Sequence, residues 1–251
     1  MNNKYWVNEI KNNFNNAARK YSNYSFIQKY FANKLISIIE KLEPPKGKWL
    51  DLGSGTGFLA DLIENKLISN EVIRIDFSSK MLFENKKDSK TILWDLNLNL
   101  PPYIDNAAMI ISCFSIHWLN EPERAIQHWF NKLVPGGFLI VLFPTNKSFP
   151  EWKETCNKCK IEYSGLTFPR EDLLKSLFKV NEIYNAEEYD YIETFPNIYR
   201  LFKSMINVGA QSSKSKRKTI SELKLMQREW PKDDFQKVNL SWNIKILILK
   251  K

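Results

Sequence analysis

The first forty residues carry apolar side chains at intervals of three and four positions, the spacing of one face of a helix. This pattern runs from residue 9 to residue 42 and predicts a continuous helical segment. The segment ends before Pro44 and Pro45, because proline lacks an amide hydrogen and clashes with the preceding helical turn. A helical unit is therefore expected ahead of the first strand.

Between residues 45 and 145, short apolar runs alternate with amphipathic stretches. The apolar runs are rich in Ile, Leu and Val, which is typical of strands buried on both faces. They predict strands at 49–52, 72–76, 91–94, 108–112 and 138–143. The amphipathic stretches predict helices at 58–65, 79–86 and 122–133. Strands that alternate with helices in this way form a parallel sheet covered on both faces.

The pattern loosens after Pro144. Helices are predicted at 149–164, 170–178, 197–208 and 219–229, strands at 181–194 and 237–250, and a polar loop at 211–218. The predicted fold class is α/β, a doubly wound, mostly parallel, Rossmann-like sheet of seven strands. We expect one domain over 1–251, composed of a helical cap (1–44), a nucleotide-binding core (45–145), a helical insertion with the sixth strand (146–235) and a terminal strand (236–251).

A glycine-rich turn follows the first predicted strand. Residues 50–57 read Leu-Asp-Leu-Gly-Ser-Gly-Thr-Gly, and glycine permits positive φ angles and close approach of the backbone to a ligand. The turn alone is weak evidence, because a nicotinamide-binding Rossmann protein would look similar.

Acidic residues at the strand ends narrow the choice of cofactor. Asp51 lies just before the first glycine, where it could receive a ligand ammonium group or order the loop. Asp76 ends the second strand, where a carboxylate accepts hydrogen bonds from ribose hydroxyls. Asp95 ends the third strand, where it could accept from an adenine amino group while Leu96 packs on the ring. Together these residues describe a site for an adenosine with a cationic amino-acid tail, S-adenosylmethionine (SAM).

The predicted site contains no metal. The predicted cofactor-binding residues are Asp51, Gly53, Ser54, Gly55, Gly57, Asp76, Phe77, Met81, Asp95, Leu96 and Ser112.

Over residues 45–145 these motifs resemble those of the seven-stranded class I SAM-dependent methyltransferases. The flanks are similar to the malonyl-[acyl-carrier protein] O-methyltransferase family of biotin synthesis, and this resemblance spans nearly the whole chain. The segments that carry it are Phe14-x-x-Ala17-Ala18-x-x-Tyr21 with Gln28, 112–118, 148–152, Phe168-x-x-x-Asp172-Leu173, 203–210 and Glu229-Trp230-Pro231. Two positions depart from the family: Ser54 replaces a frequent Cys, and Ile206 stands where some members carry Lys.

The resemblance implies methyl transfer from SAM to the free carboxylate of a malonyl thioester. The partner it implies is an acidic acyl-carrier protein that carries malonyl, and malonyl-coenzyme A stays open as the thioester. The resemblance also implies that the N-terminal helix folds over the cofactor, with the insertion on the substrate side. A malonyl carboxylate is already ionised near neutral pH, so no catalytic base is nominated.

Six side chains are candidates for contact with this substrate: Tyr21, His117, Trp118, Arg170, Arg200 and Lys203. An acidic substrate should meet a cation, and a guanidinium group matches a carboxylate with two hydrogen bonds; Arg19 is a further candidate. Tyr21 and Trp118 are expected in the pocket wall. We expect His117 to orient the substrate or to lie at the core edge, because deprotonation of a carboxylate is unnecessary.

The formal net charge of +9 favours acidic partners, and both nucleic acid and an acidic carrier protein are of that kind. The lysines are dispersed, and the one dense cluster is 214–218, Lys-Ser-Lys-Arg-Lys. Residues 112–115 also lack an Asn-Pro-Pro-Tyr-type motif for amino-group methylation. We therefore expect no nucleic-acid partner. The alternative function is methylation of a small free carboxylic acid or of a quinone precursor.

The remaining composition is that of a globular enzyme, with 43% hydrophobic and 26% charged residues. No apolar run approaches the roughly 20 residues that cross a bilayer, and the N-terminus does not resemble a secretion signal. Cys156 and Cys159 have no second pair or nearby His to complete a zinc site, so they are expected one turn apart on a helix. We expect a cytoplasmic monomer without membrane contact.

Overall fold

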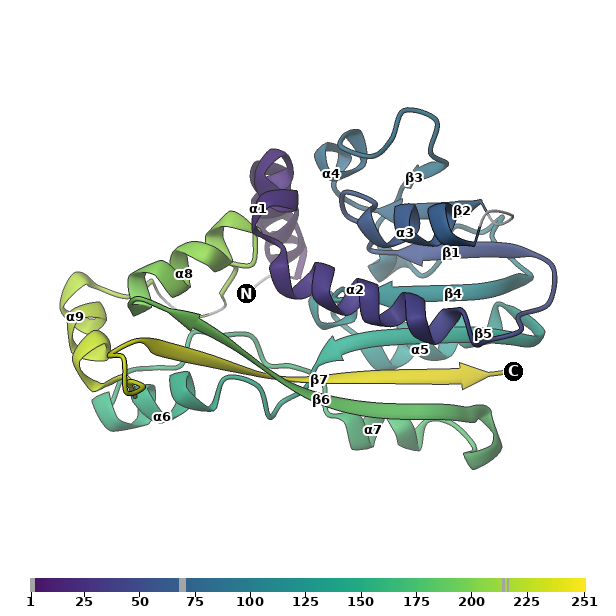
Figure 1. The fold of residues 1–251 in the computed structure, drawn as a ribbon. Coiled ribbons are helices and arrows are strands. Elements are labelled where there is room, and N and C mark those ends of the chain that lie inside the picture. Colours follow the sequence, from purple (N-terminus) through teal and green to yellow (C-terminus); the bar gives the residue numbers. More distant parts are fainter. Residues whose placement is uncertain (1–2, 68–70, 214, 216) are drawn as a thin grey trace.

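The computed structural model describes residues 3–67, 71–213, 215 and 217–251. In these ranges one sheet has the strand order β3-β2-β1-β4-β5-β7-β6 (Figure 1). Its strands are β1 (Lys48–Leu52), β2 (Val72–Asp76), β3 (Thr91–Leu93), β4 (Ala107–Cys113), β5 (Leu133–Pro144), β6 (Ile183–Phe195) and β7 (Val238–Lys250). The first five pair in parallel, and β7 is antiparallel to β5 and β6. The predicted α/β fold with a mostly parallel seven-stranded sheet is confirmed.

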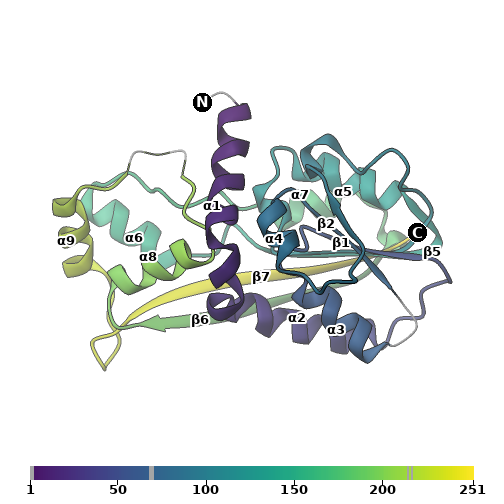
Figure 2. The ribbon, with the colours of Figure 1, turned by 90° about the horizontal axis from the view of Figure 1, so that it is seen from above.

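Helices cover both faces of the sheet, because its central strands are apolar on both sides. The helices are α1 (Asn3–Tyr24), α2 (Phe26–Ile39), α3 (Phe58–Lys66), α4 (Ser79–Phe83), α5 (Pro122–Asn131), α6 (Pro150–Cys159), α7 (Glu171–Ser176), α8 (Ile198–Asn207) and α9 (Ile220–Glu229). One core cluster joins α2 and α3 to the sheet, and a second joins α5 and α7 to the opposite face. Figure 2 shows these two pairs on opposite sides of the sheet.

The N-terminal unit is two helices, so the single helix predicted from 9 to 42 is wrong. The chain leaves helical geometry at Ser25, where φ is −82° and ψ is 52°. Ser25 is buried, and the residues just before it, 22–24, are exposed. The break lets the two helices take different neighbours: α1 packs against α4 and α8, whereas α2 packs against α3. Apolar spacing alone does not reveal such a change of direction.

Several predicted ends also shift. Helix α4 stops at Phe83 instead of 86, and α6 stops at Cys159 instead of 164. Lys160 ends α6 in a left-handed conformation, with φ of 55°. Short 3₁₀ turns at Leu96–Leu98, Ile116–Trp118 and Val180–Glu182 were not predicted. Such turns are too short to give a periodic pattern.

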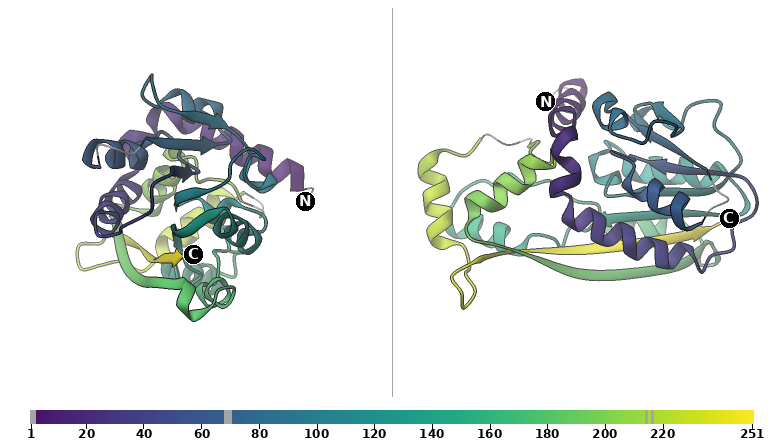
Figure 3. Two further views of the ribbon diagram at one scale, coloured as in Figure 1. Left: turned by 90° about the vertical axis from the view of Figure 1, so that its right-hand side faces the viewer. Right: turned by 45° about the horizontal axis from the view of Figure 1, so that its top comes forward.

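Strands β6 and β7 extend beyond the end of β5, the strand that pairs with β7 in the sheet. Strand β7 pairs with β5 only from Ile244 to Lys250, but it pairs with β6 from Val238 to Leu249. The protruding halves, 190–195 and 238–243, carry α6, α8 and α9, and we call this assembly the distal lobe. Figure 3 shows it at the end of the molecule away from β1–β3.

The distal lobe has an apolar core of its own, which includes Phe149, Trp152, Leu201, Met226 and Trp230. The two cysteines of α6 are free thiols, as is Cys113. Within the described ranges, no helix is long and apolar enough to cross a membrane.

Candidate functional site

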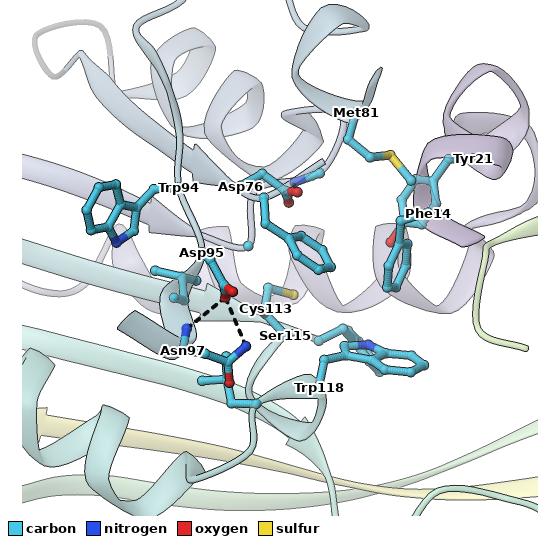
Figure 4. Close-up of a pocket in the computed structure, with 16 residues that line it drawn as sticks. Phe14, Tyr21, Asp76, Met81, Trp94, Asp95, Asn97, Cys113, Ser115 and Trp118 are labelled. Carbon is cyan, nitrogen blue, oxygen red and sulfur yellow. Dashed lines mark hydrogen bonds between the residues drawn. The ribbon is translucent and has the colours of Figure 1, made fainter. Parts of the chain in front are cut away.

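The site lies at the point where the order of the strands in the sheet reverses, between β1 and β4. The strand order places β1 beside β4, with β2 and β3 on one side and β5 on the other. Ligands of such sheets bind at this switch point, beyond the carboxyl ends of the strands. A pocket opens there, lined by residues that follow β1, β2, β3 and β4 and by two residues of α1 (Figure 4).

The glycine turn after β1 forms the floor of the pocket. Gly53, Gly55 and Gly57 all have positive φ, at 73°, 55° and 79°. A Cβ atom at Gly53 would lie 2.1 Å from Ser115 Oγ, whereas one at Gly55 would meet no atom within 4 Å. The turn therefore packs tightly on one side and leaves its backbone open at Gly55, as close approach of a ligand requires.

A buried arginine behind the turn was missed by sequence reasoning. Arg74 of β2 has no exposed side-chain surface, and its guanidinium pairs with Asp61 at 2.8 Å and Glu64 at 2.5 Å. It also donates to Asn85 Oδ1 at 3.0 Å, and Asn85 Nδ2 donates in turn to the carbonyl of Gly55 at 2.9 Å. The two ion pairs fix the Arg74 guanidinium, and the Asn85 side chain links it to the glycine turn at Gly55. The only sequence signal is a charged residue inside an apolar strand.

Two buried carboxylates lie at the turn. Asp76 accepts hydrogen bonds from the amides of Gly55 (2.9 Å) and Ser78 (2.8 Å), and burial raises its pKa to about 6. Asp51 is 2% exposed, and its Oδ2 has no hydrogen-bond partner among the described residues. Burial raises the pKa of Asp51 to about 7, and the charge of Asp76 adds to this increase although Arg74 opposes it. The pocket floor and the layer behind it therefore carry acidic groups that a cation would stabilise.

The opposite side of the pocket floor follows β3. Asp95 caps a 3₁₀ turn, and its Oδ1 accepts from the backbone and side-chain nitrogens of Asn97 at 3.0 and 2.9 Å. Leu96 is almost fully buried beside it. Both residues line the pocket with Trp94, so a polar acceptor and flat apolar surface lie side by side.

Helix α1 forms the wall of the pocket that faces the strand ends. Phe14 and Tyr21 face it from the helix, opposite Asp76 and Asp95 (Figure 4). The Phe14 ring meets the Trp118 ring edge to face, with 5.3 Å between centroids. Burial raises the pKa of Tyr21, so its phenol stays neutral. Asn15 Oδ1 accepts from Ser78 Oγ at 2.7 Å, which ties α1 to the start of α4.

A larger chamber of about 850 Å³ adjoins this pocket, between α1, the start of α2 and the distal lobe. Its walls are rich in aromatic side chains, and its polar members include Gln28, His117 and Glu193. The described cations that line it are Arg217 and Lys218. The remaining lysines of the basic cluster, Lys214 and Lys216, lie outside the described residues.

The structure brings most of the predicted cofactor residues into the pocket: Gly53, Gly55, Asp76, Phe77, Met81, Asp95 and Leu96. Asp51, Ser54, Gly57 and Ser112 lie behind this lining. Ser112, for example, is fully buried and donates to the carbonyl of Leu52 at 3.1 Å.

Of the predicted substrate contacts, the aromatic and imidazole side chains line the cavities and the cationic ones do not. Tyr21 and Trp118 line both cavities, and His117 lines the chamber. Arg170, Arg200, Lys203 and Arg19 line neither cavity. Arg170 instead pairs with Asp172 at 2.6 Å, and Arg200 and Lys203 lie on the exposed face of α8. Their positions depend on how α8 packs, which the sequence does not show.

The pocket fits a ligand that is both adenosine-like and cationic. Asp76 and Asp95 offer acceptors at two strand ends, and Leu96 and Trp94 offer apolar surface for a ring. The unpartnered Oδ2 of Asp51 and the raised pKa of both buried aspartates indicate negative charge that the protein does not compensate fully. SAM carries an adenosine, a sulfonium and an ammonium group, and so meets each of these requirements.

Comparisons with known proteins agree with this geometry. A family profile described as a methyltransferase domain matches residues 50–141. A protein of Ilyobacter polytropus named malonyl-[acyl-carrier protein] O-methyltransferase 2 is 28% identical, over 91% of this chain and 89% of its own. A malonyl-[acyl-carrier protein] O-methyltransferase of Bacillus cereus is 25% identical, over 81% of each chain.

A solved structure of a SAM-dependent methyltransferase from Archaeoglobus fulgidus shares the fold. It has a TM-score of 0.53 at 14% identity and covers 89% of this chain and 94% of its own. Fold, pocket and relatives thus point to the same donor.

Proposed function

Because this chain is a class I SAM-dependent methyltransferase, we propose that it methylates the free carboxylate of a malonyl thioester carried by an acidic acyl-carrier protein. Its methyl donor is SAM. The observation that carries the acceptor assignment is the likeness to two malonyl-[acyl-carrier protein] O-methyltransferases over more than four-fifths of the chain, together with the chamber beside the donor pocket.

The size of the chamber supports a thioester over a small free acid. Its volume of about 850 Å³ lies in the range that holds drug-sized ligands and is much larger than a three-carbon diacid needs. A malonyl group attached to a long thiol arm would use the remaining length. Both the donor pocket and the chamber contact Trp118, so an acceptor in the chamber would face the donor.

In this proposal the protein contributes position and exclusion of water. SAM supplies an electrophilic methyl group on a positively charged sulfur. Asp76 and Asp95 orient the adenosine portion, and Asp51 provides negative charge behind the turn. Phe14 and Tyr21 of α1 cover the pocket, which removes water from around the carboxylate nucleophile. A carboxylate needs no deprotonation, so alignment and desolvation provide the rate increase.

The mouth of the chamber suits a carrier protein. Exposed apolar side chains line it, among them Tyr5, Phe26 and Ile206 with 62%, 65% and 51% of their surface exposed. Exposed apolar groups of this kind mark interaction sites. Arg217 and Lys218 line the same chamber and would attract an acidic partner.

The reaction is tested by transfer of radiolabelled methyl from SAM to three kinds of acceptor: malonyl-carrier protein, malonyl-coenzyme A and free dicarboxylic acids. We expect the malonyl-carrier protein to have the highest kcat/KM. Turnover of a free acid, without product from either thioester, would overturn the proposed function.

Docking is tested separately with Arg217→Glu and Lys218→Glu. Each change should raise KM for malonyl-carrier protein and leave a short malonyl thioester unaffected, because only the carrier brings an acidic protein surface to these side chains. An equal loss with both acceptors would contradict docking at this segment. The same experiment on Lys216, which belongs to the cluster predicted from the sequence, asks whether the contact extends along the loop.

A further inference from the structure

The donor pocket and the chamber share a wall of aromatic side chains, which we call the neck. Four residues line both cavities: Phe14, Tyr21, Phe114 and Trp118. Phe114 has a φ of 52°, a conformation that non-glycine residues rarely adopt. A methyl group that passes from the donor to an acceptor in the chamber must cross this neck. The groups beside it therefore hold the reacting end of the acceptor.

Two polar side chains of the chamber wall, His117 and Gln28, adjoin a neck residue or a residue that packs on one. His117 precedes Trp118, and their rings are 5.3 Å apart. Gln28 lies one helical turn before Phe31, whose ring is 5.9 Å from that of Phe114. The aromatic rings of Phe168 and Trp242 connect the two sides, with His117 and Phe168 centroids 5.5 Å apart and Phe168 and Trp242 centroids 6.4 Å apart.

Both side chains lack a hydrogen bond within the described part of the chain. Gln28 Oε1 and His117 Nδ1 are buried and have no partner. A buried polar atom without a partner costs about 1–3 kcal/mol, so a ligand that bonds to the group is favoured. Rotation of the terminal amide lets Gln28 offer either Oε1 or its N–H donors to the chamber, and a carboxylate would accept from the N–H donors. Burial lowers the pKa of His117 to about 3, which keeps its imidazole neutral at physiological pH and able to donate one N–H.

Cations are absent from the neck among the described residues. Of those that line the chamber, Arg217 and Lys218 are on the segment between α8 and α9. Lys218 donates to the carbonyl of Glu162, just after α6 in the distal lobe. The chamber wall also holds the carboxyl group of Glu193, which accepts from Trp242 Nε1 at 2.8 Å.

Neutral donors suit this reaction better than a cation. A carboxylate oxygen forms a bond to the methyl carbon, the carbon–sulfur bond breaks, and its electron pair stays on sulfur. A negative acceptor and a positive donor become two neutral groups, so charge disappears in the transition state. A lysine or arginine bound to the carboxylate would stabilise the charged ground state more than the transition state, and only differential stabilisation raises the rate.

We propose that the Gln28 amide and the His117 imidazole together bind the acceptor carboxylate at the neck, without a cationic partner. This inference rests on the proposed function, since it names the residues that recognise the carboxylate. It replaces the arginine and lysine contacts expected from the sequence with two neutral hydrogen-bond donors.

The first test changes charge at Gln28. Gln28→Glu keeps the shape of the side chain but places a carboxylate beside the acceptor carboxylate. The probes are the malonyl thioester of N-acetylcysteamine and its carboxamide analogue, which cannot be methylated and is measured as an inhibitor. We expect kcat/KM for the malonyl thioester to fall about 100-fold or more, because like charges in contact cost several kcal/mol. Inhibition by the neutral carboxamide should change by less than about threefold.

The second test removes and restores the donor at position 117. His117→Phe should lower kcat/KM about 10- to 100-fold, the range expected for a hydrogen bond to a charged group. His117→Asn should retain most of the activity, because its amide nitrogen reaches a position near that of Nδ1. His128→Phe and Gln127→Glu make the same chemical changes on α5, outside both cavities, and should match wild type.

Binding of SAM by calorimetry and the midpoint of thermal unfolding separate recognition from folding. Both should stay near wild-type values in Gln28→Glu and His117→Phe. Wild-type kcat/KM in both variants, or equal loss of the malonyl thioester and the carboxamide in Gln28→Glu, would overturn the inference while the proposed function stands. Absence of any methyl ester with wild-type protein would overturn the proposed function, and this inference with it.

Discussion

At the scale of single residues, Asp51 and Asp76 link the pocket to pH. Burial raises their pKa values to about 7 and about 6, above the ordinary value near 3.9. The folded protein therefore holds protons that the unfolded chain releases between about pH 4 and pH 7. In that window these two groups lower the free energy of unfolding as the pH rises.

SAM binding should reverse this effect, because its positive groups favour the ionised carboxylates. We predict that SAM affinity increases about tenfold or more between pH 5.5 and pH 7.5, with release of protons on binding. Calorimetry in buffers of different ionisation enthalpy measures both quantities. Asp51→Asn should remove the part of the increase centred near pH 7 and leave the part that belongs to Asp76. A flat profile in the wild-type protein would contradict the assigned electrostatics.

Two glycines with similar backbone angles test the packing of the turn. Gly53 has φ of 73° and Gly136 has φ of 78°, but only at Gly53 would a Cβ atom collide, with Ser115. Gly53→Ala and Gly136→Ala should both lose about 1–2 kcal/mol of stability from backbone strain. Only Gly53→Ala should also abolish measurable SAM binding by calorimetry. Retention of SAM affinity in Gly53→Ala would show that the turn tolerates displacement.

At the scale of elements, the buried Arg74 joins β2 to α3 and to the glycine turn. Its ion pairs with Asp61 and Glu64 and its bond to Asn85 leave no part of the side chain exposed. Arg74→Met should lower the free energy of unfolding by about 3 kcal/mol, the cost of leaving buried partners unpaired. It should also weaken SAM binding, because Asn85 holds the carbonyl of Gly55.

The matched control is Arg124→Met on α5. Arg124 and Glu121 form a pair that is mostly exposed, with 74% and 67% of their side-chain surfaces accessible. Exposed pairs contribute about 0–1 kcal/mol, so the free energy of unfolding measured by chemical denaturation should barely change in Arg124→Met. Equal destabilisation by Arg74→Met and Arg124→Met would contradict the structural role of Arg74.

Helix α1 is the element that joins the two cavities. It contacts the donor side through Asn15 and Ser78, and the acceptor side through Asn13 Nδ2, which donates to Ser212 Oγ at 2.8 Å. Phe14, between Asn13 and Asn15 in the sequence, is part of the neck. The break at Ser25 allows this arrangement, because a single straight helix could not lie on the sheet and also cross the site.

At the scale of the whole molecule, the net charge of +9 should act on the carrier rather than on the chemistry. Raising the salt concentration from about 0.05 to about 0.3 M shortens the range of electrostatic attraction. We predict a several-fold increase in KM for malonyl-carrier protein and little change for the N-acetylcysteamine thioester. Initial rates with both acceptors measure this, and salt dependence that is the same for both would contradict long-range attraction of the carrier.

The sequence by itself determined the fold class and the donor. Strand and helix periodicity, the glycine turn and acids at strand ends are local features, so they placed Gly53, Asp76 and Asp95 at one edge of a parallel sheet. A local pattern records which residues share an element and where that element ends.

Only the tertiary structure decided which residues line the chamber. Gln28 and His117 come from α2 and from the turn after β4, and their meeting at one chamber depends on how α1, α2 and the distal lobe pack. The same packing turned Arg200 and Lys203 to solvent and buried Arg74. Contacts between distant segments follow from the burial of whole faces, and the spacing of residues within one segment carries no record of them.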